Sequence, residues 1–172
     1  MDNKMGQISE LFFENPTKDF HIRGIARQLN IPKTTASYHI HSLLEKNIIV
    51  KQEEGVFPSF RANETSEKYR FYKKQEFMKT LVESGLLDYV EEQTRPKCII
   101  LFGSFAKAEY DEKSDIDLFV QANDAKLDLS KFERKLKHKI NVLFGENLNK
   151  LSKDLLNNII NGIKLQGYIK LR

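Results

Sequence analysis

Hydrophobic positions near the start of the chain repeat at the spacing of an α-helix. The segment 21–30 carries its apolar residues on one face, which predicts an amphipathic helix. Pro32 opens a second apolar stripe over 32–47, and because proline lacks a backbone donor it suits the first turn of a new helix. The apolar residues are Ile22, Ile25, Ala26 and Leu29 in the first helix and Ala36, Ile40, Leu43 and Leu44 in the second.

The second predicted helix leaves a polar, hydroxyl-rich face near its N-terminus. Compact donors and acceptors in such a place reach base edges and phosphates of the DNA major groove. The strand-forming runs 48–55 and 56–63 meet at Glu54 and Gly55 and predict a β-hairpin, whose lysine can reach the phosphate backbone. The candidate DNA contacts are Lys33, Thr34, Thr35, Ser37, Tyr38, His41 and Lys51.

Residues 21–63 resemble the winged helix-turn-helix family of transcriptional regulators, with IPKTTASYHIHSLLEKNIIVKQ matching the recognition helix, its exit and the first wing strand. The resemblance implies a regulatory domain over residues 1–65 that binds double-stranded DNA. Winged helices also serve as protein–protein modules, so a docking role is the alternative. His39 and His41 face different directions on the helix and cannot share a metal ion; we expect His39 to be partly packed or solvent-facing.

A helical segment connects the two halves of the chain. Residues 66–84 are predicted to form a connecting helix, and the Ser84–Gly85 pair interrupts it before a second helix begins. Helices that follow a wing often self-associate in such regulators, which favours a homodimer. The apolar residues expected on one face are Phe71, Met78, Leu81 and Val82.

The segment CIILFGSFAKAEYDEKSDIDLFV is typical of a buried strand, a tight turn, a short helix, a loop and a second strand. Gly103 permits close backbone approach after the first strand, and Ser104 offers a hydroxyl and amides to a phosphate. Asp115 and Asp117 flank Ile116, so strand alternation sends both carboxylates to one face. A hard cation such as Mg²⁺ would compensate their charge and bind phosphate oxygens.

This segment closely resembles minimal members of the DNA polymerase β-like nucleotidyltransferase superfamily, in which a Gly-Ser turn, a basic residue three positions later and an Asp-x-Asp pair recur. The resemblance implies that Gly103, Ser104 and Lys107 bind a nucleoside triphosphate. It also implies that Asp115 and Asp117 are the catalytic residues and ligands of Mg²⁺. The predicted fold class is thus α+β, a winged helix-turn-helix domain followed over residues 85–172 by a small α/β nucleotidyltransferase-like domain with a mixed sheet.

The resemblance weakens on the third predicted strand, INVLFG. Active members usually carry a third carboxylate there, and the matching residue is Asn141, which cannot act as a base. Ala108 also replaces a common glycine. Three functions stay open. The first is a DNA-binding regulator that transfers a nucleotide to a small molecule or a partner protein such as a companion toxin, and the second is a catalytically inactive nucleotide-sensing regulator. The third is a DNA-binding dimer whose C-terminal domain binds protein and keeps the two aspartates for structure.

Charge and composition change this picture little. The net charge is +4, yet residues 1–70 hold ten Lys or Arg against nine Asp or Glu, so the DNA prediction depends on pattern. No stretch approaches the roughly 18 apolar residues of a membrane span, and the first residues lack the regions of a signal peptide, which predicts a cytoplasmic protein without membrane contact. The single cysteine, Cys98, lies in an apolar run and is expected in the core.

Overall fold

The structure, a computed structural model, describes residues 3–53 and 57–169 and divides the chain into two compact units, Met1–Glu76 and Phe77–Arg172. The division falls within helix α4 (Glu67–Ser84), which covers most of the predicted connecting segment. Glu54 and Gly55, the predicted turn of the hairpin, lie outside the described residues.

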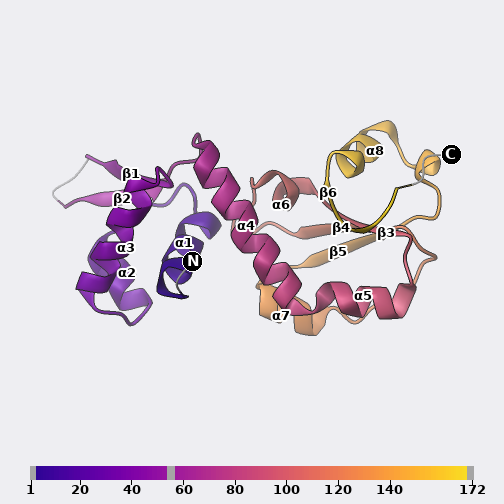
Figure 1. The fold of residues 1–172 in the computed structure, drawn as a ribbon, viewed down its shortest axis with the longest axis horizontal. Helices are drawn as coiled ribbons and strands as arrows, with labels where there is room; N and C mark the ends of the chain where they lie inside the picture. Colours follow the sequence, from indigo (N-terminus) through magenta and orange to yellow (C-terminus); the bar gives the residue numbers. More distant parts are fainter. Residues whose placement is uncertain (1–2, 54–56, 170–172) are drawn as a thin grey trace. The chain divides into compact units, whose positions relative to one another are not determined.

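The N-terminal unit contains three helices and a two-stranded antiparallel sheet (Figure 1). Pro32 is the N-cap of α3, so the predicted break between two helices is confirmed. Phe20 forms an isolated antiparallel β-bridge with Phe60 of β2, so one residue of the preceding loop pairs with the hairpin. The first helix was not predicted from the sequence. The elements are α1 (Asn3–Glu14), α2 (Ile22–Gln28), α3 (Lys33–Glu45), β1 (Ile49–Gln52) and β2 (Ser59–Ala62), followed by α4.

The core of this unit joins the predicted apolar stripes to α1. Ile25, Ile40 and Leu43 are fully buried, and they pack in one cluster with Phe12 and Phe13. The apolar residues of α2 and α3 therefore pack against α1, which supplies these two aromatic side chains. The burial of the helices also corrects one expectation: His39 is only 6% exposed and belongs to the buried polar residues, not to the solvent-facing ones.

The C-terminal unit is built on a four-stranded mixed sheet of order β5-β4-β3-β6 (Figure 1). β3 pairs antiparallel with both β4 and β6, whereas β4 pairs parallel with β5. The mixed sheet agrees with the predicted fold class. The elements are α5 (Leu86–Thr94), β3 (Cys98–Phe102), α6 (Gly103–Lys107), β4 (Ile116–Val120), α7 (Ser130–Leu136), β5 (Ile140–Phe144), the 3₁₀ helix η1 (Leu148–Lys150), α8 (Lys153–Ile160) and β6 (Ile163–Gly167).

Helices cover both faces of the sheet, and β3 and β4 are accordingly apolar at nearly every position. Ile99 and Leu101 pack in one cluster with residues of α5 and α7, while Cys98 and Ile100 pack in another with Ile159 of α8. Cys98 is 0% exposed, as expected for a core residue, and burial raises the pKa of its thiol. Strands that are buried on both faces have continuous apolar runs, and this explains the sequence CIILF.

The residues predicted to form one apolar face of helix α4 are not all buried. Met78 and Leu81 pack into the core of the C-terminal unit, but Phe71 is 56% exposed and Val82 is 60% exposed. In the described part of the chain, no helix combines the length and apolarity that crossing a membrane requires.

Candidate functional site

Two carboxylates and one amide converge where β4 and β5 begin. Asp115 immediately precedes β4, and Asp117 is opposite Asn141 in the parallel register of β4 and β5. The Nδ2 of Asn141 donates to Oδ2 of Asp115 at 3.3 Å and to Oδ1 of Asp117 at 3.1 Å. The two carboxylates therefore share one face, as strand alternation predicted, and the tertiary structure adds the amide that partly compensates their charge.

Gly103 makes room for one of these carboxylates. It directly follows β3, whose last residue Phe102 pairs with Asp117, and its φ of +73° lies in the left-handed region. A Cβ at this position would overlap with Oδ2 of Asp117. The backbone conformation therefore favours glycine, and any residue with a Cβ would have to displace the carboxylate of Asp117.

We expect Gly103→Ala to damage the site more than strain alone can explain. A left-handed alanine costs about 1–2 kcal/mol, and the new methyl would also displace Asp117. Gly85→Ala is the matched control, because Gly85 has a φ of +78° but no atom within 4 Å of the place that an alanine methyl would occupy. The backbone strain should lower the melting temperature by a comparable amount in both variants. Calorimetry should show weaker Mg²⁺-dependent nucleotide binding in Gly103→Ala alone. Equal binding by the two variants would contradict the steric argument.

The loop before Asp115 is braced by side chains and backbone. The Ser114 hydroxyl accepts from the Asp111 amide at 2.9 Å and donates to Oδ1 of Asp111 at 3.0 Å. The carbonyl of Ser114 is 2.8 Å from Nδ1 of His138, which is 7% exposed and packs edge-on against Phe105. His138 was not identified from the sequence, since its partner is 24 residues away and only the pairing of β4 with β5 brings them together.

The other predicted phosphate contacts lie on α6. Ser104 is half-buried in the first turn, next to Gly103, and Lys107 is exposed at the end of the helix. Neither side chain forms a hydrogen bond or an ion pair with another described residue, so both are available to a ligand. Ala108 follows with a φ of +59°, which explains why a glycine would be favoured at this position.

The donor set suits a hard cation with few protein ligands. Carboxylate oxygens of Asp115 and Asp117 are the ligands that Mg²⁺ prefers, and a rotation of the Asn141 amide would present its oxygen in place of Nδ2. Across residues 3–53 and 57–169, no group of three or more His, Cys, Asp or Glu side chains is placed to hold a metal ion. The two aspartates are thus the charged ligands of the candidate cation site, and the neutral Asn141 occupies the place where a third carboxylate is expected.

The candidate DNA contacts lie mainly at the surface of the N-terminal unit. Tyr38 is 72% exposed, and Nδ1 of His41 is 2.7 Å from the carbonyl of Ser37 one turn earlier. Thr35 and Ser37 are half-buried. The exposed candidates are Lys33, Thr34, Tyr38, His41 and Lys51.

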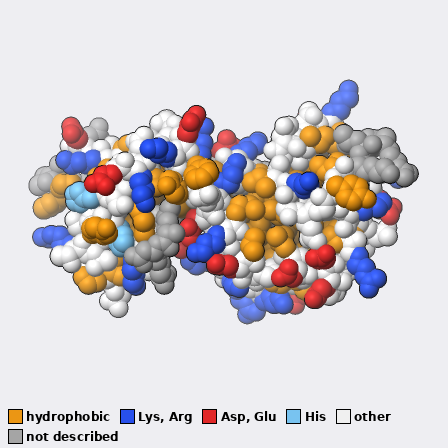
Figure 2. Space-filling model, in the orientation of Figure 1, with side chains coloured by type: hydrophobic (Ala, Val, Ile, Leu, Met, Phe, Trp, Pro, Cys, Tyr) orange, Lys and Arg blue, Asp and Glu red, His pale blue; other side chains and the backbone are white. Residues whose placement is uncertain are grey.

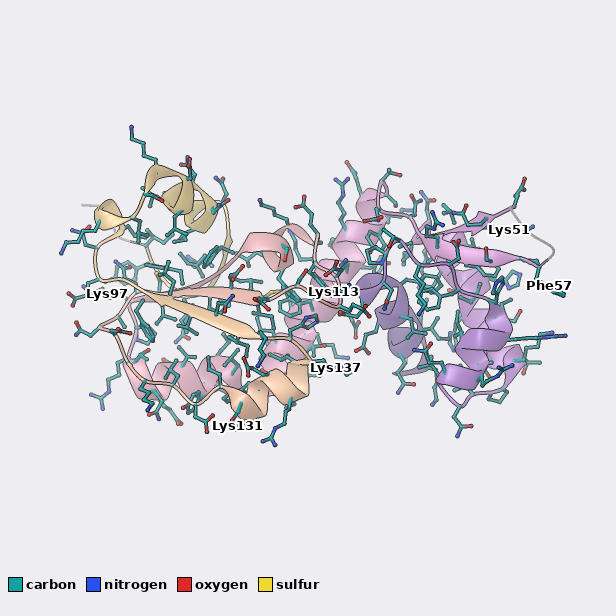
Figure 3. All side chains as sticks on the ribbon, turned by 180° about the vertical axis from the view of Figure 1, so that it is seen from behind. Lys51, Phe57, Lys97, Lys113, Lys131 and Lys137 are labelled. Atoms are coloured by element: carbon teal, nitrogen blue, oxygen red, sulfur yellow. The ribbon has the colours of Figure 1, made fainter. Side chains whose placement is uncertain are left out.

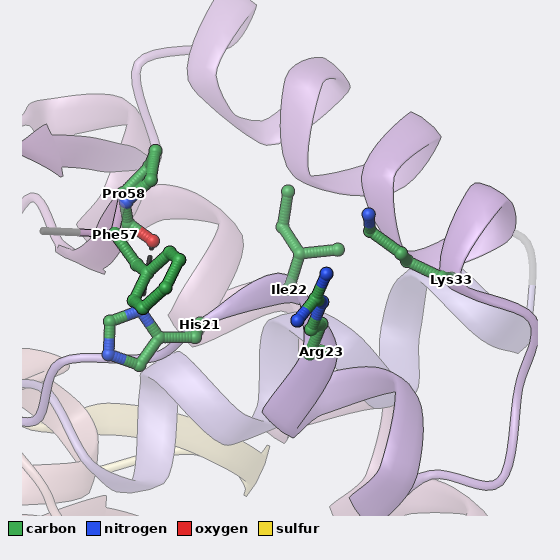
Figure 4. Close-up of a pocket in the computed structure, with 6 residues that line it drawn as sticks. All are labelled: His21, Ile22, Arg23, Lys33, Phe57 and Pro58. Carbon is green, nitrogen blue, oxygen red and sulfur yellow. Dashed lines mark hydrogen bonds between the residues drawn. The ribbon is translucent and has the colours of Figure 1, made fainter.

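A hollow of about 380 Å³ lies beside Lys33, where the start of α2 faces the hairpin (Figure 4). Nδ1 of His21 is 2.9 Å from the carbonyl of Pro58, and this contact ties the hairpin to α2. Arg23 and the exposed ring of Phe57 complete the wall with Ile22. These residues were not predicted from the sequence, because their proximity follows from the hairpin's return to α2 and not from helical spacing.

Similarity to known families is found in the C-terminal unit. The family model described as polymerase beta, nucleotidyltransferase matches residues 85–167, which include the glycine–serine turn, both aspartates and Asn141. The match and the mixed sheet together support a nucleotidyltransferase domain in this unit. A search of curated proteins found no match to the chain.

Proposed function

We propose that the chain is a DNA-binding regulator whose C-terminal domain binds a Mg²⁺–nucleoside triphosphate and transfers a nucleotide to an acceptor. The observation that carries the proposal is the convergence of Asp115 and Asp117 beside Gly103, within the segment that matches the nucleotidyltransferase model. Such pairs orient a triphosphate and neutralise the charge that develops during phosphoryl transfer.

Each residue of the site has a proposed role. Asp115 and Asp117 would hold Mg²⁺, which when bound neutralises phosphate charge and polarises the reacting phosphorus. The backbone of the turn at Gly103 and Ser104 would contact phosphate oxygens, and Lys107 would add a positive charge. The exposure of these groups supports the roles, because a ligand can reach all of them.

The proposed transfer forms a bond between an acceptor oxygen and the α-phosphorus of the triphosphate. The bond from that phosphorus to the bridging oxygen breaks, and pyrophosphate leaves. The proton of the acceptor goes to water, because the amide of Asn141 has no basic atom to accept it. Catalysis in this site would consist of positioning and charge stabilisation, without a general base at the third position.

The second candidate is a nucleotide sensor in which the same pocket binds its ligand without chemistry. Asn141 favours it, since the neutral amide replaces the expected carboxylate and already satisfies both aspartates. Binding of nucleotide by the C-terminal domain would then alter DNA affinity. The two candidates share the pocket and differ only in whether a covalent product forms.

Labelled nucleotides separate the two candidates. We expect the full chain, incubated with α-labelled ATP, CTP, GTP or UTP and a set of acceptors, to transfer label in Mg²⁺ and not in EDTA. Acceptors would include small molecules, neighbouring-gene proteins and oligonucleotides. Metal-dependent nucleotide binding without any transfer would support the sensor, and the absence of both would contradict the proposed site.

For the N-terminal unit we propose a winged helix-turn-helix domain in which α3 enters the major groove. The short α2–α3 break, the hairpin after α3 and the exposed polar face of α3 support this assignment. Lys51 on β1 would contact the phosphate backbone (Figure 3). The companion predictions of a homodimer and of a partner protein as acceptor remain predictions.

The DNA proposal predicts different effects for two exposed residues of α3. Tyr38→Ala should weaken binding to the selected operator by about 1–3 kcal/mol, the usual cost of one lost base contact. Lys33→Ala should weaken binding to all duplexes and lower the salt slope by about 1. Lys68→Ala on α4 is the control, because it removes an equal charge from outside the proposed surface. Fluorescence anisotropy over a salt series measures both quantities, and unchanged binding would remove α3 as the recognition helix.

A further inference from the structure

One short segment, which leads from α7 into β5, holds the backbone on both sides of Asp115. Nδ1 of His138 is 2.8 Å from the carbonyl of Ser114. The carbonyl of Lys139 accepts from the amide of Ile116, also at 2.8 Å. These two contacts engage the two peptide groups that flank Asp115. Because a residue has only two soft backbone angles between planar peptide groups, holding both groups fixes the direction in which its side chain leaves the backbone.

The imidazole of His138 is itself held by the core of the C-terminal unit. Its ring is edge-on to that of Phe105, with the centroids 4.9 Å apart, and Phe105 stacks on Tyr110 at 4.1 Å. Figure 2 shows charged side chains at the edge of the unit where Figure 1 places α7, yet His138, in the segment that follows α7, is only 7% exposed. A carbonyl oxygen can only accept, so Nδ1 must donate, and the packed ring keeps this donor in place.

His138 supports the candidate site from behind the sheet. Ile116 packs in the same cluster as Phe105, on the face covered by α5 and α7. Asp115 and Asp117 alternate with Ile116 and therefore point to the opposite face, the one that α8 covers. The imidazole thus lies on the other side of the strand from a ligand of the two carboxylates, and it can act on the site only through the backbone.

We propose that His138 is a positioning residue of the candidate nucleotidyltransferase site, which directs the Asp115 carboxylate by donating from Nδ1 to the carbonyl of Ser114. The side chain of Asp115 also accepts a 3.3 Å hydrogen bond from Asn141, but rotation of that amide towards a cation would break this bond. The restraint on the backbone would remain. Groups that orient a metal ligand in this way change metal affinity by about 10–100-fold. The inference rests on the proposed Mg²⁺–nucleotide binding and is independent of whether transfer follows.

The experiment compares three substitutions of His138 in the full chain. His138→Asn keeps an amide donor at the position of Nδ1, His138→Gln moves the donor one bond further along the side chain, and His138→Phe fills the space without a donor. Phe132→Leu is the control for lost packing, because Phe132 is buried in the same core cluster as Phe105 and its ring contacts Tyr89 of α5. Calorimetry with Mg²⁺ and each of ATP, CTP, GTP and UTP measures binding, and thermal melts in EDTA measure stability.

We expect His138→Phe and His138→Gln to bind Mg²⁺–nucleotide about tenfold or more weakly than the unaltered protein. His138→Asn should recover most of the lost affinity, and Phe132→Leu should lower the melting temperature with little change in binding. Recovery by asparagine identifies the donor, since a residue that only fills the core would be replaced better by phenylalanine. If His138→Phe does not fold, His138→Gln decides, because it keeps a polar side chain of similar length.

Failure of this inference can be told apart from failure of the proposed function. If the unaltered protein binds nucleotide with Mg²⁺ and His138→Gln binds it equally well, the inference is overturned and the proposed site stands. If the unaltered protein shows no such binding, the site and the inference fail together. An equal loss of affinity in Phe132→Leu and in all three His138 variants would reflect general destabilisation, and it would also overturn the inference.

Discussion

Asp115→Asn/Asp117→Asn should abolish Mg²⁺-dependent nucleotide binding and lower transfer at least about 100-fold, because both charged ligands of the cation are lost. The side chains keep their shape, and the amide of Asn141 loses two charged acceptors that are exposed to water. The repulsion between the two carboxylates also disappears. The variant should therefore remain folded, and its melting temperature in EDTA should be close to that of the unaltered protein.

Asp124→Asn serves as the control for this variant, since it removes a carboxylate from an exposed loop of the same unit. Calorimetry with Mg²⁺ and each nucleotide measures binding, and α-labelled nucleotide measures transfer. If the double variant retains both nucleotide binding and transfer, Asp115 and Asp117 have only a structural role. A parallel loss in the control would point to a general effect of charge.

Asn141→Asp should convert the pair of carboxylates into a set of three and make the stability of the protein depend on Mg²⁺. Without metal, the variant exchanges two hydrogen bonds donated by Nδ2 for repulsion among three carboxylates. All three groups are at least partly exposed, so the loss should be small, about 1 kcal/mol. With metal, the added charge should raise Mg²⁺ affinity about tenfold or more, and metal bound to the folded state stabilises it further.

Thermal melts of Asn141→Asp in EDTA and over a Mg²⁺ series measure this crossover. Asn123→Asp is the matched control, because it adds one negative charge on an exposed loop of the same unit. A carboxylate can also accept the proton of the acceptor, so transfer should increase or first appear in Asn141→Asp. Identical Mg²⁺ titrations in the two variants would contradict a cation site between Asp115, Asp117 and residue 141.

Of these two variants, only Asn141→Asp bears on the choice between the candidate functions. If the unaltered protein transfers nucleotide, Asn141→Asp changes a rate that already exists. If it only senses nucleotide, Asn141→Asp tests whether one missing carboxylate accounts for the absent chemistry. In both cases the loss of binding in Asp115→Asn/Asp117→Asn is expected, since each candidate uses the same two carboxylates.

Local patterns predicted much of the C-terminal unit. The apolar runs gave β3 and β4, glycine gave the turn at residue 103, and the alternation of Asp115, Ile116 and Asp117 gave two carboxylates on one face. These features depend on residues within about ten positions of one another, and such periodicity can be read directly. The exposure of Phe71 and Val82 could not be read in the same way, because α4 spans two cores that bury different parts of it.

The N-terminal unit shows the same contrast between features that local sequence predicts and features that depend on tertiary contacts. The two apolar stripes of α2 and α3 and the break at Pro32 are local, and they were predicted. Helix α1 was not, and it supplies Phe12 and Phe13, which close the core against Ile25 and Ile40. The contact of His21 with Pro58 joins residues 37 positions apart and follows only from the return of the hairpin to α2.

By itself, the sequence determined which chemical groups the protein carries and which short elements present them: a glycine–serine turn, two alternating aspartates and a polar helix face. Only the tertiary structure decided their partners. The register of β4 and β5 sets Asn141 against both aspartates, and the pairing of β3 with β4 places Gly103 next to the carboxylate of Asp117. Strand register and packing join residues far apart in the chain, and no local spacing encodes them.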